Sequence, residues 1–308
     1  MSVFASANAD FSPIISQAVN EVDRQAFAGQ RILPVVPTGT SKGKYVKIEA
    51  NQFDNDLAKP RAPGSNFASA SQEYTSASFD CEEYGLEVSI DDLELQIAAD
   101  DALLDVAVVT ANQIADDLAI GHEIRCAASV AGAGMNATAA TAAMSVVATA
   151  TPIADISNAV LRLNAAGIFR GISLVMEASL YAEMTQCDDM RTLINGSGQT
   201  FWSTDQVSKV LGVDEVIICN TRYNAAKKGQ SRSASKIWPD DAYYVAQISG
   251  GPFSNGGLGR TLAYTARGGV YVAETFRTEQ PPASVDRVRQ NVDEVVINAN
   301  AGEEITGA

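Results

Sequence analysis

Few residues in this chain have types and spacing suited to chemistry. The single histidine, His122, is followed directly by Glu123. A helical zinc-protease motif needs a second histidine one turn further on, and the common nucleophile–base arrangements also rely on a histidine base. We therefore interpret His122 as a partly buried helix residue rather than as a base or a metal ligand.

The remaining candidates for chemistry are weaker. The glycine-rich segment 250–259 neither follows a strand nor opens a helix, and the chain contains no Gly-Lys-Ser/Thr triplet, so we interpret this segment as a turn. Asp54 and Asp56 do not have the spacing of an EF-hand calcium loop. The pairs Asp188–Asp189 and Asp240–Asp241 are typical of solvated turns and caps. The sequence thus assigns no catalytic residue, no cofactor and no metal.

The four cysteines, Cys81, Cys126, Cys187 and Cys219, are widely spaced and form no Cys-x-x-Cys motif. Scattered cysteines of this kind are typical of reduced thiols in a cytoplasm. Free cysteine packs as a small apolar side chain, so we predict four buried and inert thiols.

Composition narrows the class of protein. The 308 residues suffice for two domains or one elaborate domain, and a hydrophobic fraction of 46% supports a large core. The net charge is −15, with 37 acidic and 22 basic residues. Tight nucleic-acid binding needs clustered cations, so this balance disfavours it and leaves only a local basic patch. No apolar run approaches the ~18 residues of a membrane span, and the first residues do not resemble a signal peptide.

Larger elements must position these residues, and the clearest is a helix predicted over 100–131. Asp100 and Asp101 suit its N-cap, and small apolar residues then recur every three or four positions. Gly132 and Gly134 follow its expected end. A helix of this length, roughly 45 Å, with a narrow stripe of small residues predicts a strut along which other elements pack.

The segments before the strut look incomplete on their own. An amphipathic helix is predicted over 11–27, ended by Gly29, either docked on its own domain or packed as an arm on a neighbouring subunit. Segment 31–38 is predicted to be extended, and its two prolines exclude a central strand. Residues 42–49 and 74–90 alternate polar and apolar, and the polar stretch between them predicts a long hairpin. An isolated hairpin is marginal in water, so we expect it to need a neighbour.

After the strut, the pattern predicts an α/β unit followed by long strands. Residues 131–149, notably 145–148, are predicted as strand or extended linker. Thr204 is the predicted cap of a helix that stops at Gly212, and Lys227–Arg232 is predicted as a basic loop. The other predicted helices cover 93–98, 152–166 and 178–185; the predicted strands cover 172–176, 216–219, 243–246, 261–264, 270–276 and 285–297, the last two ending the chain.

No convincing active site accompanies these elements, whereas an arm, a projecting hairpin and a strut are parts that bury their faces between subunits. The order of parts resembles the HK97-type major capsid proteins of tailed bacteriophages over most of the chain. The stretches that carry the resemblance are 44–46, 59–64, 84–92, the end of the strut at 122–125, 223–229 with 237–238, and 286–289.

The resemblance implies an α+β fold with four kinds of part. Residues 1–42 correspond to the N-arm, 43–90 to the extended E-loop, 91–151 to the P-domain with its spine helix at about 100–131, and 152–265 to the α/β A-domain. Residues 266–308 are then return strands completing the P-domain. The loop near 227–235 is a candidate for one that gathers around a capsomer axis.

The resemblance also implies a homo-oligomer of pentamers and hexamers in an icosahedral phage head that encloses double-stranded DNA. Expected partners are scaffolding, portal and decoration proteins, and scaffolding is expected to come from a separate protein. The resemblance also implies assembly in the host bacterial cytoplasm and a location in the capsid of the virion. The expected inter-subunit contacts are made by Lys44, Lys59, Arg61, Phe11, Ile15 and Val19. Lys59 lacks the asparagine and glutamate partners of a covalent cross-link, so none is expected.

An acidic shell would repel packaged DNA rather than trap it, which agrees with enclosure without tight binding. Two alternatives stay open at this stage. The first is an encapsulin-like nanocompartment that has the same fold but encloses an enzyme. The second is an enzyme with an unrecognised site in residues 152–265.

Overall fold

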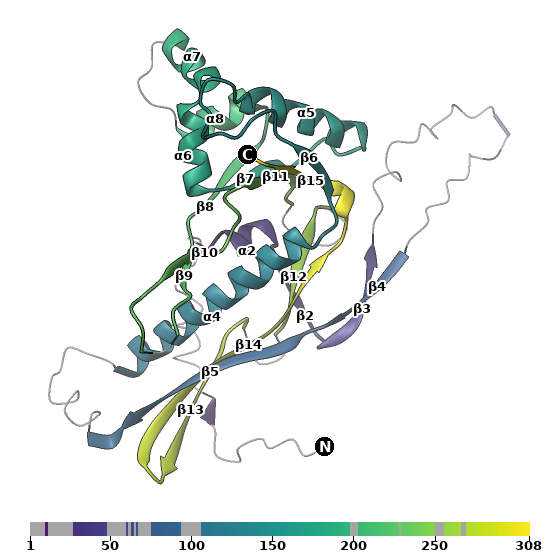
Figure 1. The fold of residues 1–308 in the computed structure, drawn as a ribbon. Coiled ribbons are helices and arrows are strands. Elements are labelled where there is room, and N and C mark those ends of the chain that lie inside the picture. Colours follow the sequence, from purple (N-terminus) through teal and green to yellow (C-terminus); the bar gives the residue numbers. More distant parts are fainter. Residues whose placement is uncertain are drawn as a thin grey trace.

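The computed structural model describes residues 10–11, 27–47, 60, 63–64, 66, 75–93, 106–197, 203–227, 229–249, 256–265 and 269–308. In these residues the fold is α+β, with two main sheets joined by one long helix (Figure 1). No helix in the described part of the chain is long and apolar enough to cross a membrane.

The long helix, α4, runs from Val106 to Ala131. Its end agrees with the prediction, while residues 100–105 lie outside the described part. Small apolar residues bury one face of its first half against strands of the larger sheet, because short side chains let helix and strand backbones approach closely. This cluster consists of Ala111, Ile114, Ala115, Leu118, Tyr271, Ala273 and Val288.

The larger sheet has six strands in the order β1-β13-β14-β12-β2, with β5 also pairing to β14. Its longest strand, β14, pairs with β13 and β5 near its start and with β12 near its end. β2 lies at the sheet edge, parallel to β12, which suits the proline at position 37. The bounds are β1 Asp10–Phe11, β2 Val35–Thr38, β5 Glu82–Asp91, β12 Gly259–Tyr264, β13 Val272–Glu279 and β14 Pro282–Val296.

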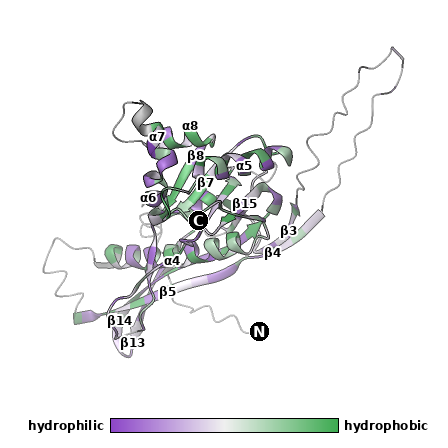
Figure 2. Cartoon of the chain, turned by 45° about the horizontal axis from the view of Figure 1, so that its top comes forward, coloured by the Kyte–Doolittle hydropathy of each residue, from purple (hydrophilic) through white to green (hydrophobic). Residues whose placement is uncertain are grey.

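The second sheet has five strands in the order β6-β15-β11-β7-β8. Helices α5, α6 and α8 contribute to the hydrophobic cluster on one face, while α2 and α4 contribute to the cluster on the other (Figure 2). All six residues of β7 are therefore buried, including Ser173 and Glu177. The bounds are β6 Asn136–Ala139, β7 Ile172–Glu177, β8 Glu215–Cys219, β11 Ala242–Gln247, β15 Gly302–Thr306, α2 Ala28–Ile32, α5 Pro152–Ala165, α6 Ala178–Gln186, α7 Asp188–Ser197, α8 Thr204–Leu211 and the 3₁₀ turn η3 Ala299–Ala301.

Two small two-stranded sheets complete the fold. β3 (Lys42–Lys47) and β4 (Thr75–Asp80) form the predicted hairpin pairing, from Lys42 opposite Asp80 to Lys47 opposite Thr75. This hairpin extends away from the body (Figure 1). β9 (Arg222–Asn224) and β10 (Ala234–Lys236) form a second, shorter hairpin.

Several predictions for the first 100 residues need correction. Gly29 does not end a helix but lies inside α2, and residues 31–32 are helical rather than extended. The alternating run 74–90 is broken at Cys81, and its second half, β5, joins the six-stranded sheet instead of the hairpin. The predicted helix 11–27 lies largely outside the described residues, while Phe11 itself is in strand β1. The predicted helix 93–98 also lies largely outside them.

Three further corrections concern the rest of the chain. Residues 145–148 form turns and bends, and the strand of this region is β6, Asn136–Ala139. Ser203, not Thr204, caps α8, through a capping box with Gln206. The helix α7 was not predicted, and Asp188 and Asp189 stand in its first turn.

The chain end differs as well. β13 and β14 lie beside α4, but the final strand β15 pairs with β11 and β6 and so belongs to the five-stranded sheet. β15 was not predicted, because its five residues, Gly-Glu-Glu-Ile-Thr, contain two glutamates and one large apolar side chain. Glu303 is nevertheless buried, since Arg162 of α5 pairs with it.

Candidate functional site

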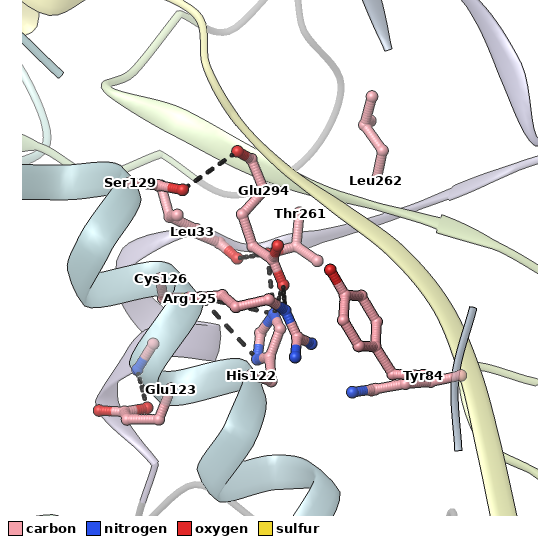
Figure 3. Close-up of polar contacts among 12 residues, drawn as sticks. Leu33, Tyr84, His122, Glu123, Arg125, Cys126, Ser129, Thr261, Leu262 and Glu294 are labelled. Atoms are coloured by element: carbon pink, nitrogen blue, oxygen red, sulfur yellow. Dashed lines mark hydrogen bonds and ion pairs between the residues drawn. The ribbon is translucent and has the colours of Figure 1, made fainter. Parts of the chain in front are cut away.

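The second half of α4 carries polar side chains into the interior, where they contact distant parts of the chain. His122 and Glu123 are 3% and 0% exposed. Together with Arg125, Thr261 and Glu294 they form what we call the polar cluster (Figure 3). A buried charged group is costly unless it is paired and hydrogen-bonded, so each member's partners decide what the cluster does.

Glu123 joins three segments that are far apart in sequence. Its carboxylate accepts the backbone N–H of Gly29 at 2.6 Å and the indole N–H of Trp238 at 2.6 Å. It also accepts the N–H of Ala28, so it satisfies the first turn of α2, whose own N-cap residue provides no side-chain bond. Burial raises the pKa of Glu123, and these hydrogen bonds partly offset that effect.

Gly29 makes this contact possible because it has no side chain. A Cβ at position 29 would lie 2.7 Å from Glu123 Oε2 and 3.0 Å from Cys126 Cβ. The backbone of α2 therefore lies directly against α4 only because a glycine is present. Trp238 closes the other side, packing edge-to-face on Tyr244 with ring centroids 6.4 Å apart.

His122 is neutral in this environment. Burial, aided by the nearby Arg125, lowers the pKa of His122 to about 4. Its Nε2 lies 3.2 Å from Thr261 Oγ1, and Thr261 in turn donates to the carbonyl of Leu33 at 3.1 Å. An Nε2-protonated ring donating to Thr261 satisfies both hydroxyl contacts, so the histidine serves as a link between α4 and β12.

Arg125 and Glu294 form the charged pair of the cluster. Arg125 Nε donates to Glu294 Oε1 at 3.0 Å, and its guanidinium carbon lies 3.7 Å from the centre of the Tyr84 ring. Burial raises the pKa of Glu294, and Arg125 opposes that shift. The pair thus ties α4 to β14 and β5, the two neighbouring strands of the six-stranded sheet.

Three potential metal ligands converge here: His122 Nε2, Cys126 Sγ and a Glu294 oxygen lie within 4.8 Å of one another. The sulfur is 3.4 Å from Nε2 and 3.8 Å from Nδ1, which places it beside the ring face rather than along the Nε2 lone pair. Glu294 is already engaged by Arg125. Because a metal would need the lone pair, the thiolate and the carboxylate to point at one centre, the arrangement fits a hydrogen-bonded network better.

A second charged cluster lies in the α/β unit, around the buried carboxylate of Glu177. Arg222 Nη2 lies 3.3 Å from it and Lys236 Nζ lies 3.5 Å from it. Lys236 Nζ is also 2.7 Å from Ser179 Oγ, a spacing that resembles a serine–lysine dyad. The Asp240 and Glu177 carboxylates raise the pKa of Lys236, so its amine stays protonated and cannot serve as a general base.

The predicted inter-subunit residues are only partly described. Lys44 is exposed on β3, next to Val46, which is 45% exposed. Phe11 lies in β1, which pairs with β13. Lys59, Arg61, Ile15 and Val19 lie outside the described residues. The structure therefore places two of the six and brings none of them together.

Sequence reasoning missed the role of two buried charges. Glu123 was weighed only as part of a failed zinc motif, and Arg260 was not singled out. Arg260 is 0% exposed and donates to the carbonyls of Gly259 and Gly256 at 2.7 and 2.6 Å. The signal was present for Arg260, since an arginine beside a glycine-rich loop can satisfy the loop's free carbonyls.

Comparison with known proteins gives structural matches only. The sequence matches no protein-family model, and no curated protein sequence matches it. A phage-related protein from Bordetella bronchiseptica RB50 has a similar structure, with a TM-score of 0.75 and 14% identity over 97% of this chain and 98% of that one.

Two further structures are similar over most of their length. The capsid of cyanophage P-SCSP1u matches with a TM-score of 0.58 and 14% identity, covering 91% of this chain and 87% of that chain. The virus-like particle from Pyrococcus furiosus matches with a TM-score of 0.54 and 10% identity, covering 94% and 95%. The chain therefore has the HK97-type capsid fold that its sequence predicted.

Proposed function

We propose that this protein is the major capsid protein of a tailed bacteriophage, which assembles through pentamers and hexamers into an icosahedral head around double-stranded DNA. The observation that carries the proposal is the structural match along most of both chains to a phage-related protein and to a cyanophage capsid. Fold alone does not define function.

The proposal also assigns each range of residues in the subunit to a part of the capsid fold. Residues 1–42 act as the N-arm, 43–90 as the E-loop, 91–151 with 266–308 as the P-domain, and 152–265 as the A-domain. The strand pairing supports moving two of these boundaries: β5 pairs with β14, so we assign it to the P-domain rather than to the E-loop, and β15 pairs with β11, so we assign it to the A-domain. Each unit would then bury its incomplete edges against other subunits.

Contacts between subunits are proposed to involve the cations of the hairpin region and the apolar face of the arm. Lys44 is exposed and offers its charge outward, in a chain with 37 acidic residues. Charge reversal at Lys59 and Arg61, written Lys59→Glu with Arg61→Glu, should block assembly without unfolding the subunit. Normal shells from this double variant would remove these residues from the contact.

The acidity of the chain is proposed to keep packaged DNA mobile. With a net charge of −15 per subunit, a closed shell repels polyanions wherever its inner face is acidic. Scaffolding, portal and decoration proteins are the proposed partners, and the host bacterial cytoplasm is the proposed place of assembly. A strongly basic inner surface in the assembled shell would contradict this account.

The deciding experiment is electron microscopy of the purified protein together with its mass by light scattering. Closed shells tens of nanometres across, or discrete pentamers and hexamers, are the expected result. Nucleic acid inside shells from infected cells would support a phage head, while a folded enzyme inside would favour an encapsulin-like compartment. A 32.4 kDa monomer that never assembles would direct attention to an enzyme site within residues 152–265.

A further inference from the structure

The β9–β10 hairpin lies in one of the two long stretches of this acidic chain that contain five basic residues and no acidic residue; the other is 24–48. From Val216 to Pro239 there is no aspartate or glutamate, while the same stretch contains Arg222, Lys227, Lys228, Arg232 and Lys236. In a protein with 37 acidic and 22 basic residues, an uninterrupted basic segment of this length produces a local positive surface.

The two cations at the base of this hairpin are neutralised within the chain. Arg222 pairs with Glu177 at 3.3 Å, and Lys236 pairs with Asp240 at 2.9 Å. Lys227 and Arg232 lie in the turn, and neither forms an ion pair with any residue that the structure describes. We call these two residues the basic turn.

The basic turn has a defined shape. Asn224 Oδ1 accepts the backbone N–H groups of Ala226 and Ser233 at 3.1 and 3.0 Å, which closes the neck of the loop. Gln230 N–H donates to the Lys227 carbonyl at 3.0 Å, with Gly229 at φ 88° in the left-handed region. The two cations are therefore held on an ordered loop, which lowers the entropy cost of using them in a contact.

A groove with complementary character adjoins the base of the hairpin, where Ser235 and Lys236 line it. It has a volume of about 780 Å³ and lies between the C-terminal half of α4, the segment 235–241 and the strands β11 and β15 of the five-stranded sheet. Its floor is apolar, made by Ile124, Ala127, Ala128 and Ala131, and Ile124 is 38% exposed. Asp241 and Glu304 line it, and their carboxylates form no ion pair within the described residues.

The basic turn cannot fill the groove of its own copy. Lys236, at the base of the hairpin, lines the groove, and the paired strands hold the turn at the opposite end of the hairpin. A contact between the basic turn and the groove must therefore join two copies. Such a contact uses two different patches of the same chain, which is the heterologous arrangement that closes into rings.

From these observations we infer that the basic turn of one subunit docks in the groove of a second copy of this chain, with Lys227 and Arg232 facing Asp241 and Glu304. This inference rests on the proposed capsid function. A nucleic acid is the less favoured partner, because two or three cations release few counterions and the rest of the chain carries a large negative charge.

The test compares assembly of the full-length chain with that of charge-reversed variants. Lys227→Glu with Arg232→Glu should raise the protein concentration needed for capsomers, followed by light scattering, by roughly tenfold or more, since attraction becomes repulsion. The matched control, Arg191→Glu with Lys209→Glu, makes the same charge change at exposed positions of α7 and α8 and should leave assembly unchanged. Circular dichroism and urea unfolding verify that all variants are folded.

The second part of the test reverses the two acidic charges that line the groove. Asp241→Lys with Glu304→Lys should also block assembly, and combining it with the reversed turn in one chain should restore capsomers. The inference is overturned if the reversed turn assembles as wild type does, or if the combined variant is not restored. Normal shells with reduced DNA content would instead assign the turn to nucleic acid. If the wild-type chain never assembles, the proposed capsid function itself is contradicted, whatever the variants do.

Discussion

Glu123 on α4 and Lys44 on β3 are both charged residues on regular elements, but their surroundings differ completely. Glu123 is 0% exposed and holds three hydrogen bonds from its own chain, whereas Lys44 points to solvent on a hairpin extending from the body. A buried charge that loses its partner is costly, while exposed ion pairs contribute about 0–1 kcal/mol. The polar cluster therefore stabilises the fold of the subunit, whereas the charge of Lys44 remains exposed on the surface of the hairpin.

The largest loss of subunit stability is expected when Trp238, which donates a hydrogen bond to Glu123, is removed. Trp238→Ala should lower the free energy of unfolding by about 3–5 kcal/mol, because it leaves a cavity and takes a donor from the buried Glu123 carboxylate. Urea unfolding of the unassembled subunit measures this effect. Trp238→Phe, which keeps most of the ring, should cost less; equal stability of wild type and Trp238→Ala would show that the cluster does not hold α2 in place.

Acid should weaken the cluster through His122. The unfolded histidine titrates near pH 6.5 and the folded one at about 4, so protonation below pH 6.5 favours the unfolded chain. Stability is then lost as pH falls from 6.5 to 4, by up to roughly 3 kcal/mol. His122→Gln should remove this loss, measured as the difference between its unfolding free energy and that of wild type at each pH.

The carboxylates of the cluster act in the opposite sense. Burial raises the pKa values of Glu123 and Glu294, so these groups favour the folded chain as pH falls. The comparison with His122→Gln cancels their contribution, because both proteins contain them. A difference between the two proteins that does not change with pH would contradict a neutral, buried His122.

The close contact between α2 and α4 gives a smaller effect. Gly29→Ala should destabilise the subunit by about 1–3 kcal/mol, because the added methyl group would overlap Glu123 and Cys126. Gly39→Ala is the matched control, since a Cβ there meets nothing within 4 Å and should change stability by less than about 0.5 kcal/mol. Thermal unfolding of both variants decides whether the contact matters.

The smallest effect on stability is expected at the hairpin. Lys44→Glu should change the free energy of unfolding by less than about 0.5 kcal/mol, since the residue is exposed. It should nevertheless reduce capsomer formation, measured by light scattering, whereas Lys209→Glu should not. A large loss of subunit stability in Lys44→Glu would mean that the hairpin also supports the fold of its own chain.

The same contrast explains what the sequence could predict. The stripe on α4 follows from regular spacing and β7 from a short, mainly apolar run, so the end of α4 and the bounds of β7 were predicted to within a residue. β15 and α2 could not be predicted, because they are short and their burial depends on partners distant in sequence, such as β11 and β6 for β15, or on one glycine. Hydrogen bonds such as Glu123 to Trp238 leave no local pattern, since 115 positions separate the two residues.

β14 is a single strand of 15 residues that changes partners along its length, from β13 and β5 to β12 near Val292. A force applied at the β13–β14 end of the molecule therefore travels along one continuous backbone, braced by α4, to the start of the five-stranded sheet. If the chain forms a shell as proposed, subunits in its flat and strongly curved parts would differ in shape, and β14 would stay straight in all of them. The change in shape would occur in the short segment 297–301, which connects β14 to β15.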